Sequence, residues 1–324
     1  MITLGFEGTA HTLGVGIVDS NYNVLADVRD MYKPPSGGIH PRDASQHMTA
    51  RMKPAIDKAF AEAGISMKEV DLISFSQGPG LGPCLRTVAT AARTLSLYHK
   101  KPIIGVNHCV AHIEVGKILA GFDDPLILYV SGANSQVIKL KDGRYRVFGE
   151  TLDIGVGNML DKFGRVVGLP HPAGPKIEEK AREGGKYIEL PYVVKGTDLS
   201  FSGLLTAAIQ KHERGETLED VCYSLQETAF SMLCEVAERA IAHLKACQVV
   251  LAGGVGYNKR LQGMISLVAK EHDASFAHPG KYLGDNAVMI AMTGQKMHEA
   301  GVRMSLEETV VEPKQRTDDI QVTW

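Results

Sequence analysis

The sequence lacks paired cysteines, an excess of one charge and any long apolar run. Its five cysteines are an odd number with no CxxC pair, which argues against a disulfide framework or a cysteine-ligated zinc site. We therefore expect reduced thiols and a cytoplasmic protein. No stretch approaches the roughly 18 apolar residues that cross a bilayer, and the N-terminus has no basic region followed by an apolar core. Neither a membrane partner nor a signal peptide is expected.

Charge and phosphate-binding motifs are equally sparse. The 324 residues carry a formal net charge of −2, so no broad basic field marks a nucleic-acid surface. A nucleic-acid substrate would need local patches or a basic partner. The sequence has no GxxxxGK[ST], which excludes a P-loop, and no GxGxxG, which leaves a Rossmann dinucleotide site unsupported.

The chain contains the same order of predicted elements twice. Each half has two apolar runs around a small polar cluster, then a buried strand ending in a glycine-rich turn, and finally a strand that leads into a helix. In order, these paired segments are 2–20 and 126–151, 70–82 and 247–261, and 101–119 and 273–294. The pattern predicts a duplicated α/β fold with two subdomains around a ligand cleft.

The repeat also predicts where the subdomains divide. We expect an N-terminal subdomain at 1–120, completed by 295–324, and a C-terminal subdomain at 121–294 with helical insertions at about 152–245. An amphipathic helix is predicted at 43–64. Its apolar residues, which either pack in the core or form a docking face, are Met48, Met52, Ile56 and Phe60.

Four glycine-rich turns lie at matching places in the two halves. A single glycine of this kind usually only allows a tight turn. Repeated small residues before helices also let a phosphate approach backbone N–H groups. The segments "EGTAHTLG" and "SGANSQ" are predicted to be phosphate-side hairpins, and "AGGVGYN" a wall beside adenine and ribose.

His108 and His112 are four residues apart, which places both imidazoles on one helix face. Asn107 can cap the start of this helix. Asp285 occupies the matching strand-to-helix junction of the second half, and Tyr129 ends the strand before "SGAN". Two histidines, a carboxylate and a phenolate form a plausible nitrogen and oxygen site for iron or zinc.

The histidine spacing raises a zinc protease as an alternative, because HExxH is the signature of that class. The second position of the motif is Cys109 here, where the general base should stand. Glu114 lies two residues beyond His112, about 200° around the helix from it. The zincin motif therefore fails.

Motifs along nearly the whole chain resemble one family. They are "EGTAHTLG", "FSQGPGLGP", "GVNHCVAH", "YVSGANSQV", "FGETLDIGVGN", "DLSFSGLL", "YSLQETAF" and "GDN". As a set they resemble the tRNA threonylcarbamoyl transferases of the actin-like ATPase fold, in the archaeal and eukaryotic branch that forms the catalytic subunit of the KEOPS complex.

The resemblance implies a set of site residues. The metal ligands it implies are His108, His112, Tyr129 and Asp285. The nucleotide contacts it implies are Tyr129, Val130, Ser131, Gly132, Ala133, Asp161, Gly174, Glu178 and Asn258. Ala133 and Ala173 stand where the family usually has glycine, and Tyr257 stands where it usually has alanine, so these side chains are expected to come close to the nucleotide. His11 is a weak catalytic candidate.

The resemblance also implies the reaction and its participants. The threonylcarbamoyl group would pass from threonylcarbamoyl-adenylate to the exocyclic amine of the adenosine beside the anticodon, in tRNAs that read ANN codons. The implied cofactor is one divalent metal, iron(II) in preference to zinc, with ATP or the adenylate as nucleotide ligand, with or without magnesium. The implied partners are a small kinase/ATPase, a small dimerising subunit and a tRNA-binding accessory subunit.

Three alternatives remain at this point. They are a metal-dependent glycoprotein endopeptidase, a sugar or acetate kinase-like enzyme, and a non-catalytic nucleotide-binding subunit.

Overall fold

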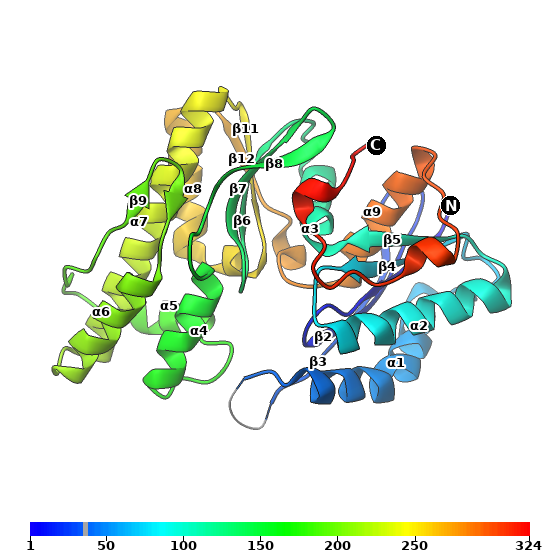
Figure 1. Cartoon of the computed structure of the whole chain (residues 1–324), viewed down its shortest axis with the longest axis horizontal. Coiled ribbons are helices and arrows are strands. Elements are labelled where there is room, and N and C mark those ends of the chain that lie inside the picture. Colours follow the sequence, from blue (N-terminus) through cyan, green and yellow to red (C-terminus); the bar gives the residue numbers. More distant parts are fainter. Residues whose placement is uncertain (35–37) are drawn as a thin grey trace. The chain divides into compact units, whose positions relative to one another are not determined.

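The computed structural model describes residues 1–34 and 38–324. The chain divides into two compact units, and each is treated by itself. The first unit contains Met1–Val115, Asp142–Tyr145 and Asp285–Trp324, and the second contains Gly116–Lys141 and Arg146–Gly284. Figure 1 labels the elements of both units.

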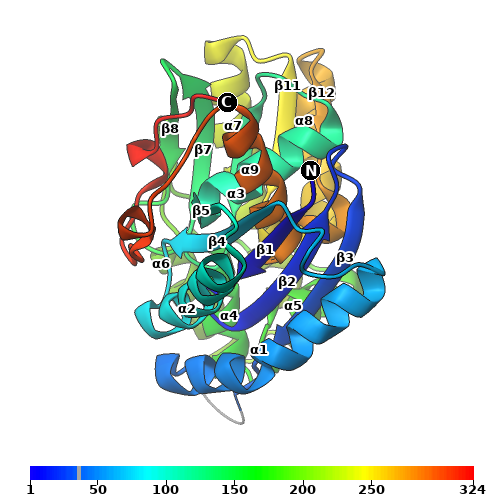
Figure 2. The same cartoon turned by 90° about the vertical axis from the view of Figure 1, so that its right-hand side faces the viewer.

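A mixed five-stranded sheet forms the centre of the first unit. Its strand order is β3(Val24–Met31), β2(Thr12–Val18), β1(Thr3–Glu7), β4(Leu72–Gly78) and β5(Ile103–Asn107). β1 pairs antiparallel with β2 and parallel with β4. These strands are almost entirely buried because helices cover both faces of the sheet. The sheet can be followed in Figure 2.

Successive side chains of β1 point to opposite faces of the sheet. Leu4 and Phe6 belong to the apolar core that contains residues of α1(Pro41–Ala63) and α2(Gly82–His99). Thr3, Gly5 and Glu7 face the other side, where Thr3 bonds to Gln295 of α9(Ala287–Glu299). The apolar face therefore supports the fold, and the other face is left for polar groups.

Glycines bring α9 unusually close to the sheet. A Cβ added at Gly5 would lie 2.5 Å from the Ala287 carbonyl oxygen, and one at Gly16 would lie 2.8 Å from the Val288 nitrogen. Gly5 and Gly16 are register partners on β1 and β2. The first turn of α9 thus lies directly on backbone, which fixes the position of the residues just before it.

The second unit repeats this sheet. Its order is β8(Arg144–Glu150), β7(Ser135–Lys141), β6(Leu126–Val130), β11(Gln248–Ala252) and β12(Ser275–Ala277), with β11 parallel to β6 and β12. The first two residues of β8, Arg144 and Tyr145, fall in the first unit. This strand order is that of the first unit. The predicted duplication is confirmed.

Further elements cover or extend the two sheets. α3 runs from His108 to Ala120, and the division between the units falls within it. The other elements are α4(Val156–Val166), α5(Gly174–Glu183), β9(Val194–Lys195), β10(Asp198–Leu199), α6(Ser202–Glu213), α7(Leu218–Leu244), α8(Lys259–Glu271) and the short 3-10 helices η1(Gly254–Tyr257), η2(Gly280–Tyr282), η3(Glu307–Thr309) and η4(Thr317–Asp319).

The structural boundaries differ from the predicted subdomains at three points. The first segment of the first unit ends at Val115 rather than 120, and its last segment begins at Asp285 rather than 295. The first unit also includes Asp142–Tyr145, which the prediction placed in the C-terminal subdomain. The reason for the second difference is that α9 packs on β1, β2 and β4. Sequence order alone assigns α9 to the half that precedes it.

The helix predicted at 43–64 is α1. Met48 is fully buried, and Met52, Ile56 and Phe60 are partly buried against the core of the first unit. These side chains therefore pack in the core, the simpler of the two interpretations.

Over residues 1–34 and 38–324, no helix combines the length and the apolar character needed to cross a membrane.

Candidate active site

His108 and His112 lie together at the start of α3, directly after β5. The Asn107 side chain accepts a hydrogen bond from the Val110 nitrogen at 3.0 Å, as the predicted cap requires. Both histidines are buried, and their ring centroids are 4.7 Å apart. The strand end and the cap thus present two imidazoles on one helix face.

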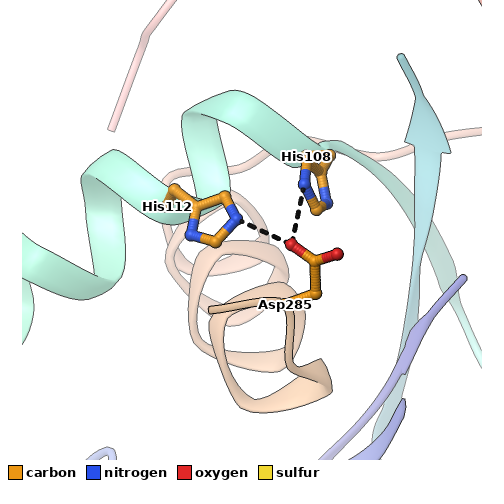
Figure 3. Close-up of side chains that lie close together, drawn as sticks. All are labelled: His108, His112 and Asp285. Atoms are coloured by element: carbon orange, nitrogen blue, oxygen red, sulfur yellow. Dashed lines mark hydrogen bonds and ion pairs between the residues drawn. The ribbon is translucent and has the colours of Figure 1, made fainter. Parts of the chain in front are cut away.

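Asp285 completes a group of three side chains within the first unit that could hold a metal ion. Its Oδ1 lies 3.5 Å from His108 Nε2 and 3.3 Å from His112 Nε2, as Figure 3 shows. One potential ligand atom from each residue falls within 4.8 Å of the other two. Imidazole nitrogens with a carboxylate oxygen are donors that zinc and iron accept. The residues present therefore fit a divalent transition metal.

Glu7 supports His108 from the opposite side. It is fully buried at the end of β1, with Oε2 3.1 Å from His108 Nδ1. Its Oε1 accepts hydrogen bonds from the Thr9 nitrogen at 2.9 Å and the Thr9 hydroxyl at 2.7 Å. A carboxylate on one ring nitrogen orients the other nitrogen of a metal-ligating histidine.

Glu7 is not among the site residues predicted from the sequence. A signal was present, because a carboxylate ends the otherwise uncharged strand "TLGFE" just before the Gly8-Thr9-Ala10 turn. A buried charge in that position needs a partner.

The ionisable groups of this cluster shift one another's pKa values. Burial disfavours a charged His108, but the Glu7 and Asp285 carboxylates outweigh it and raise the pKa of His108 to about 9. Burial, assisted by the charge of His108, lowers the pKa of His112 despite its hydrogen bond to Asp285. Burial also disfavours a charged Asp285, yet His112 and His108 hold its pKa well below the usual range. The carboxylates therefore attract positive charge to this point.

Two other predicted residues have less direct support. Tyr129 is almost fully buried near the end of β6 in the second unit, and its role as a fourth ligand stays a prediction. His11 follows β1 in the first unit, and its charge contributes to the lowered pKa of Asp285. A catalytic role for His11 also stays a prediction.

The predicted nucleotide residues all belong to the second unit. The turn after β6 is closed by a hydrogen bond from the Ser131 nitrogen to the Asn134 carbonyl at 2.7 Å. This turn lies on the start of α4, where the Asn158 nitrogen donates to the Gly132 carbonyl at 2.9 Å. A Cβ added at Gly155 would lie 2.4 Å from the Gly132 oxygen. Glycine at 155 therefore permits the contact between the turn and the helix.

Asp161 and Gly174 are close together in the second unit. Asp161, on α4, accepts a hydrogen bond from the Ala173 nitrogen at 2.7 Å, and Gly174 begins α5. Asp161 Oδ2 also lies 3.5 Å from His171 Nδ1. The carboxylate thus joins α4 to the start of α5.

Glu178 and Asn258 form another neighbouring pair. Glu178 Oε1 accepts a hydrogen bond from the Lys259 nitrogen at 3.1 Å. Asn258 caps α8 with its oxygen and donates from Nδ2 to Gln226 Oε1 at 2.8 Å. The structure therefore places Asp161, Glu178 and Asn258 against helix starts of the second unit.

The three departures from the family pattern have separate explanations. Ala173 is buried, and its methyl fills the space beside Gly164, where an added Cβ would lie only 2.2 Å away. That methyl is a core contact. Ala133 is exposed. The Tyr257 ring lies beside Gly284, and its hydroxyl donates to the Lys281 carbonyl at 2.7 Å, while 43% of the residue stays exposed.

The comparisons with known proteins identify the family. Residues 23–292 match the TsaD family, described as tRNA N6-adenosine threonylcarbamoyltransferase. The chain belongs to this family. The predicted resemblance to the tRNA threonylcarbamoyl transferases is confirmed.

Relatives of the TsaD family match over the whole chain. A protein of Thermococcus sibiricus named tRNA N6-adenosine threonylcarbamoyltransferase is 55% identical over all of both chains. A probable bifunctional tRNA threonylcarbamoyladenosine biosynthesis protein of Methanocaldococcus jannaschii is 56% identical, over 100% of this chain and 60% of its own length.

Solved structures of low identity share the fold. HypF of Thermococcus kodakarensis is 16% identical with a TM-score of 0.66, over 92% of this chain and 47% of HypF. ROK hexokinase of Thermus thermophilus is 16% identical with a TM-score of 0.50, over 93% and 100%. The predicted duplicated actin-like ATPase fold is confirmed.

Proposed function

We propose that this chain transfers the threonylcarbamoyl group from threonylcarbamoyl-adenylate to the exocyclic amine of the adenosine next to the anticodon, in tRNAs that read ANN codons. The observation that carries the proposal is the His108–His112–Asp285 group in a chain that belongs to the TsaD family. In this step the amine nitrogen bonds to the carbamoyl carbon, the bond from that carbon to the phosphate oxygen breaks, and AMP leaves with the electron pair. The amine loses one proton.

The residues of the first unit would hold one divalent metal. We expect His108, His112 and Asp285 to bind it, with Tyr129 as a fourth ligand, and iron(II) in preference to zinc. Such a metal supplies Lewis acidity that polarises a carbonyl. Glu7 holds His108 in one orientation for this purpose.

The residues of the second unit would bind the adenylate. We assign this role to Tyr129, Val130, Ser131, Gly132, Ala133, Asp161, Gly174, Glu178 and Asn258. Asp161 and Gly174 lie at the start of α5 and Asn258 lies at the start of α8, and carboxylate and amide oxygens of this kind can accept hydrogen bonds from ribose hydroxyls. AMP is a good leaving group, so the step needs no protein nucleophile.

We further propose that the chain works as the catalytic subunit of a KEOPS complex. Its partners would be the small kinase/ATPase, the small dimerising subunit and the tRNA-binding subunit. With a net charge of −2, the chain gains from partners that hold tRNA. We expect this reaction in the cytoplasm, because its substrate is tRNA.

The test reconstitutes the reaction. The chain is incubated with the partners, tRNA, threonine, bicarbonate, ATP and the enzyme that makes the adenylate, and nucleosides are analysed by mass spectrometry. We expect threonylcarbamoyl-adenosine from the wild type and at least a ~100-fold loss in Asp285→Ala, because the metal site loses its carboxylate. Equal product from both would contradict the role of Asp285.

The modification assay and a casein-cleavage assay separate the alternatives. Product formation that survives His112→Ala would indicate a non-catalytic nucleotide-binding subunit. Casein cleavage that is lost in His108→Ala would indicate the protease. Glu114 argues against the protease, because the Tyr145 hydroxyl and the Lys296 ammonium already occupy its two carboxylate oxygens.

A further inference from the structure

Glu114 is a buried carboxylate that neither the metal ligands nor the nucleotide residues explain. It lies on α3 two residues beyond His112, and its side chain is 0% exposed. A buried carboxylate is costly unless other groups pair with it. Its partners therefore indicate what it does.

Two groups from separate parts of the first unit bind the two oxygens of Glu114. The hydroxyl of Tyr145, itself fully buried, donates to Oε1. The ammonium of Lys296, on α9, lies 2.8 Å from Oε2. The ion pair thus joins α3 to α9. The hydrogen bond from Tyr145 also joins the segment Asp142–Tyr145 to Glu114.

These are the two helices whose first residues form the metal-ligand group. His108 and His112 begin α3, and Asp285 directly precedes Asn286, the N-cap of α9. Metal–ligand distances tolerate changes of only about 0.2 Å. A small slide of one helix along the other would therefore separate the imidazoles from the carboxylate.

We propose that Glu114 is a positioning residue, which fixes α3 against α9 and so sets the distance between the two histidines and Asp285. Desolvation offsets most of the attraction in a buried ion pair, so an apolar pair of similar size often stabilises a protein as well or better. What the ion pair adds is a single register, because the Glu114 carboxylate, whose side chain is 0% exposed, cannot be left unpaired. This inference rests on the metal site of the proposed function.

The test compares metal affinity with stability in five purified proteins. They are the wild type, the double variant Glu114→Leu/Lys296→Met, the single variants Lys296→Arg and Tyr145→Phe, and the control Tyr22→Phe. Tyr22 donates to Glu299 Oε2 at 2.9 Å, so the control removes a tyrosine–glutamate hydrogen bond that joins α9 to the turn between β2 and β3. Cobalt(II) and zinc(II) affinities are measured by chelator competition, and thermal unfolding is measured on the metal-free proteins.

We expect the double variant to bind both metals at least about tenfold more weakly, and to melt only slightly lower than the wild type, because the buried Tyr145 hydroxyl loses its Glu114 acceptor. Tyr145→Phe should weaken binding by a smaller factor, Lys296→Arg should keep most of the affinity, and Tyr22→Phe should keep all of it. A purely structural role would instead lower the melting temperature and leave the affinity of the folded protein unchanged.

Unchanged metal affinity in a folded double variant overturns the inference. If the double variant does not fold, Tyr145→Phe provides the test. Its metal affinity must then be lower than that of Tyr22→Phe, and equal affinities would overturn the inference. A wild type that binds neither metal overturns the proposed metal site and this inference with it. Equal binding by all five proteins overturns the inference alone.

Discussion

At the scale of single residues, the site is a chain of polar groups that are buried except for the partly exposed Asp285. Thr9 bonds to Glu7, Glu7 contacts His108, and both histidines contact Asp285. Each of these groups would be costly to bury alone. Together they compensate one another and hold two ring nitrogens toward one carboxylate.

The first prediction concerns Glu7. Glu7→Gln should weaken cobalt(II) or zinc(II) binding by about 10–100-fold, since partners of metal-ligating histidines commonly have effects of this size. Chelator competition measures the affinity, and nitrogen NMR of His108 reports which ring nitrogen carries the proton. Thr3→Val is the matched control, because Thr3 is buried on the same face of β1 and bonds to Gln295 at 3.0 Å. Equal losses in both variants would show that Glu7 has no specific role.

At the scale of elements, the site depends on where α3 and α9 begin. β5 leads directly into α3, and Asn107 caps it. α9 begins after Asn286, which accepts a hydrogen bond from the Met289 nitrogen at 2.8 Å. Bare backbone at Gly5 and Gly16 lets the first turn of α9 reach the sheet. The ligand distances are thus set by strand ends, caps and glycines.

The second prediction tests the contact of α9 with the sheet. Gly5→Ala should destabilise the protein by about 1–3 kcal/mol, because the added methyl meets the backbone of Ala287. Metal affinity should fall with it. Gly263→Ala is the control, since Gly263 lies in α8 with no atom within 4 Å of an added Cβ. That change should be neutral or stabilise by up to about 1 kcal/mol. Chemical denaturation measures both, and a neutral Gly5→Ala would contradict the close packing.

The third prediction concerns Asp153, which receives hydrogen bonds from the backbone nitrogens of Phe201 and Ser202 at the start of α6. Burial disfavours the ionised carboxylate, but these donors and the Ile154 nitrogen outweigh it and lower the pKa of Asp153 to about 2. A lowered folded-state pKa stabilises the protein above the unfolded pKa of about 3.9 and loses its effect as the pH falls toward 2.

Asp153→Asn should therefore cost about 1 kcal/mol of unfolding free energy at pH 7, because the amide loses the charge at the start of α6 and keeps only one of the two acceptor oxygens. The difference from the wild type should shrink between pH 4 and pH 2. Urea denaturation over this pH range measures it. A difference that is constant with pH would mean that the charge of Asp153 has no part in the cap.

At the scale of the whole molecule, the two halves of the duplicated fold have diverged in chemistry. The same strand order appears in both units. The first unit holds the His108–His112–Asp285 group, and the second holds the residues proposed to bind the nucleotide. On the proposed function, one architecture would thus support two different kinds of site.

The fourth prediction follows from the overall charge. With a net charge of −2, the isolated chain should bind tRNA weakly, and adding the proposed partners should tighten binding at least about tenfold. The slope of log affinity against log salt should steepen as the partners add phosphate contacts. Fluorescence anisotropy at several salt concentrations measures both. Equally tight binding by the chain alone would contradict the need for partners.

The sequence by itself determined the duplicated α/β order, the capped His108–His112 helix and the candidate ligand Asp285. These follow from local periodicity, turn residues and spacing, which depend on neighbours in the chain. Only the tertiary structure decided that α9 belongs to the first unit, that Glu7 supports His108, and that Glu114 pairs with Lys296 and Tyr145. Those contacts join residues about 30 to 180 positions apart, and no local pattern records which buried charges will meet when strands and helices pack.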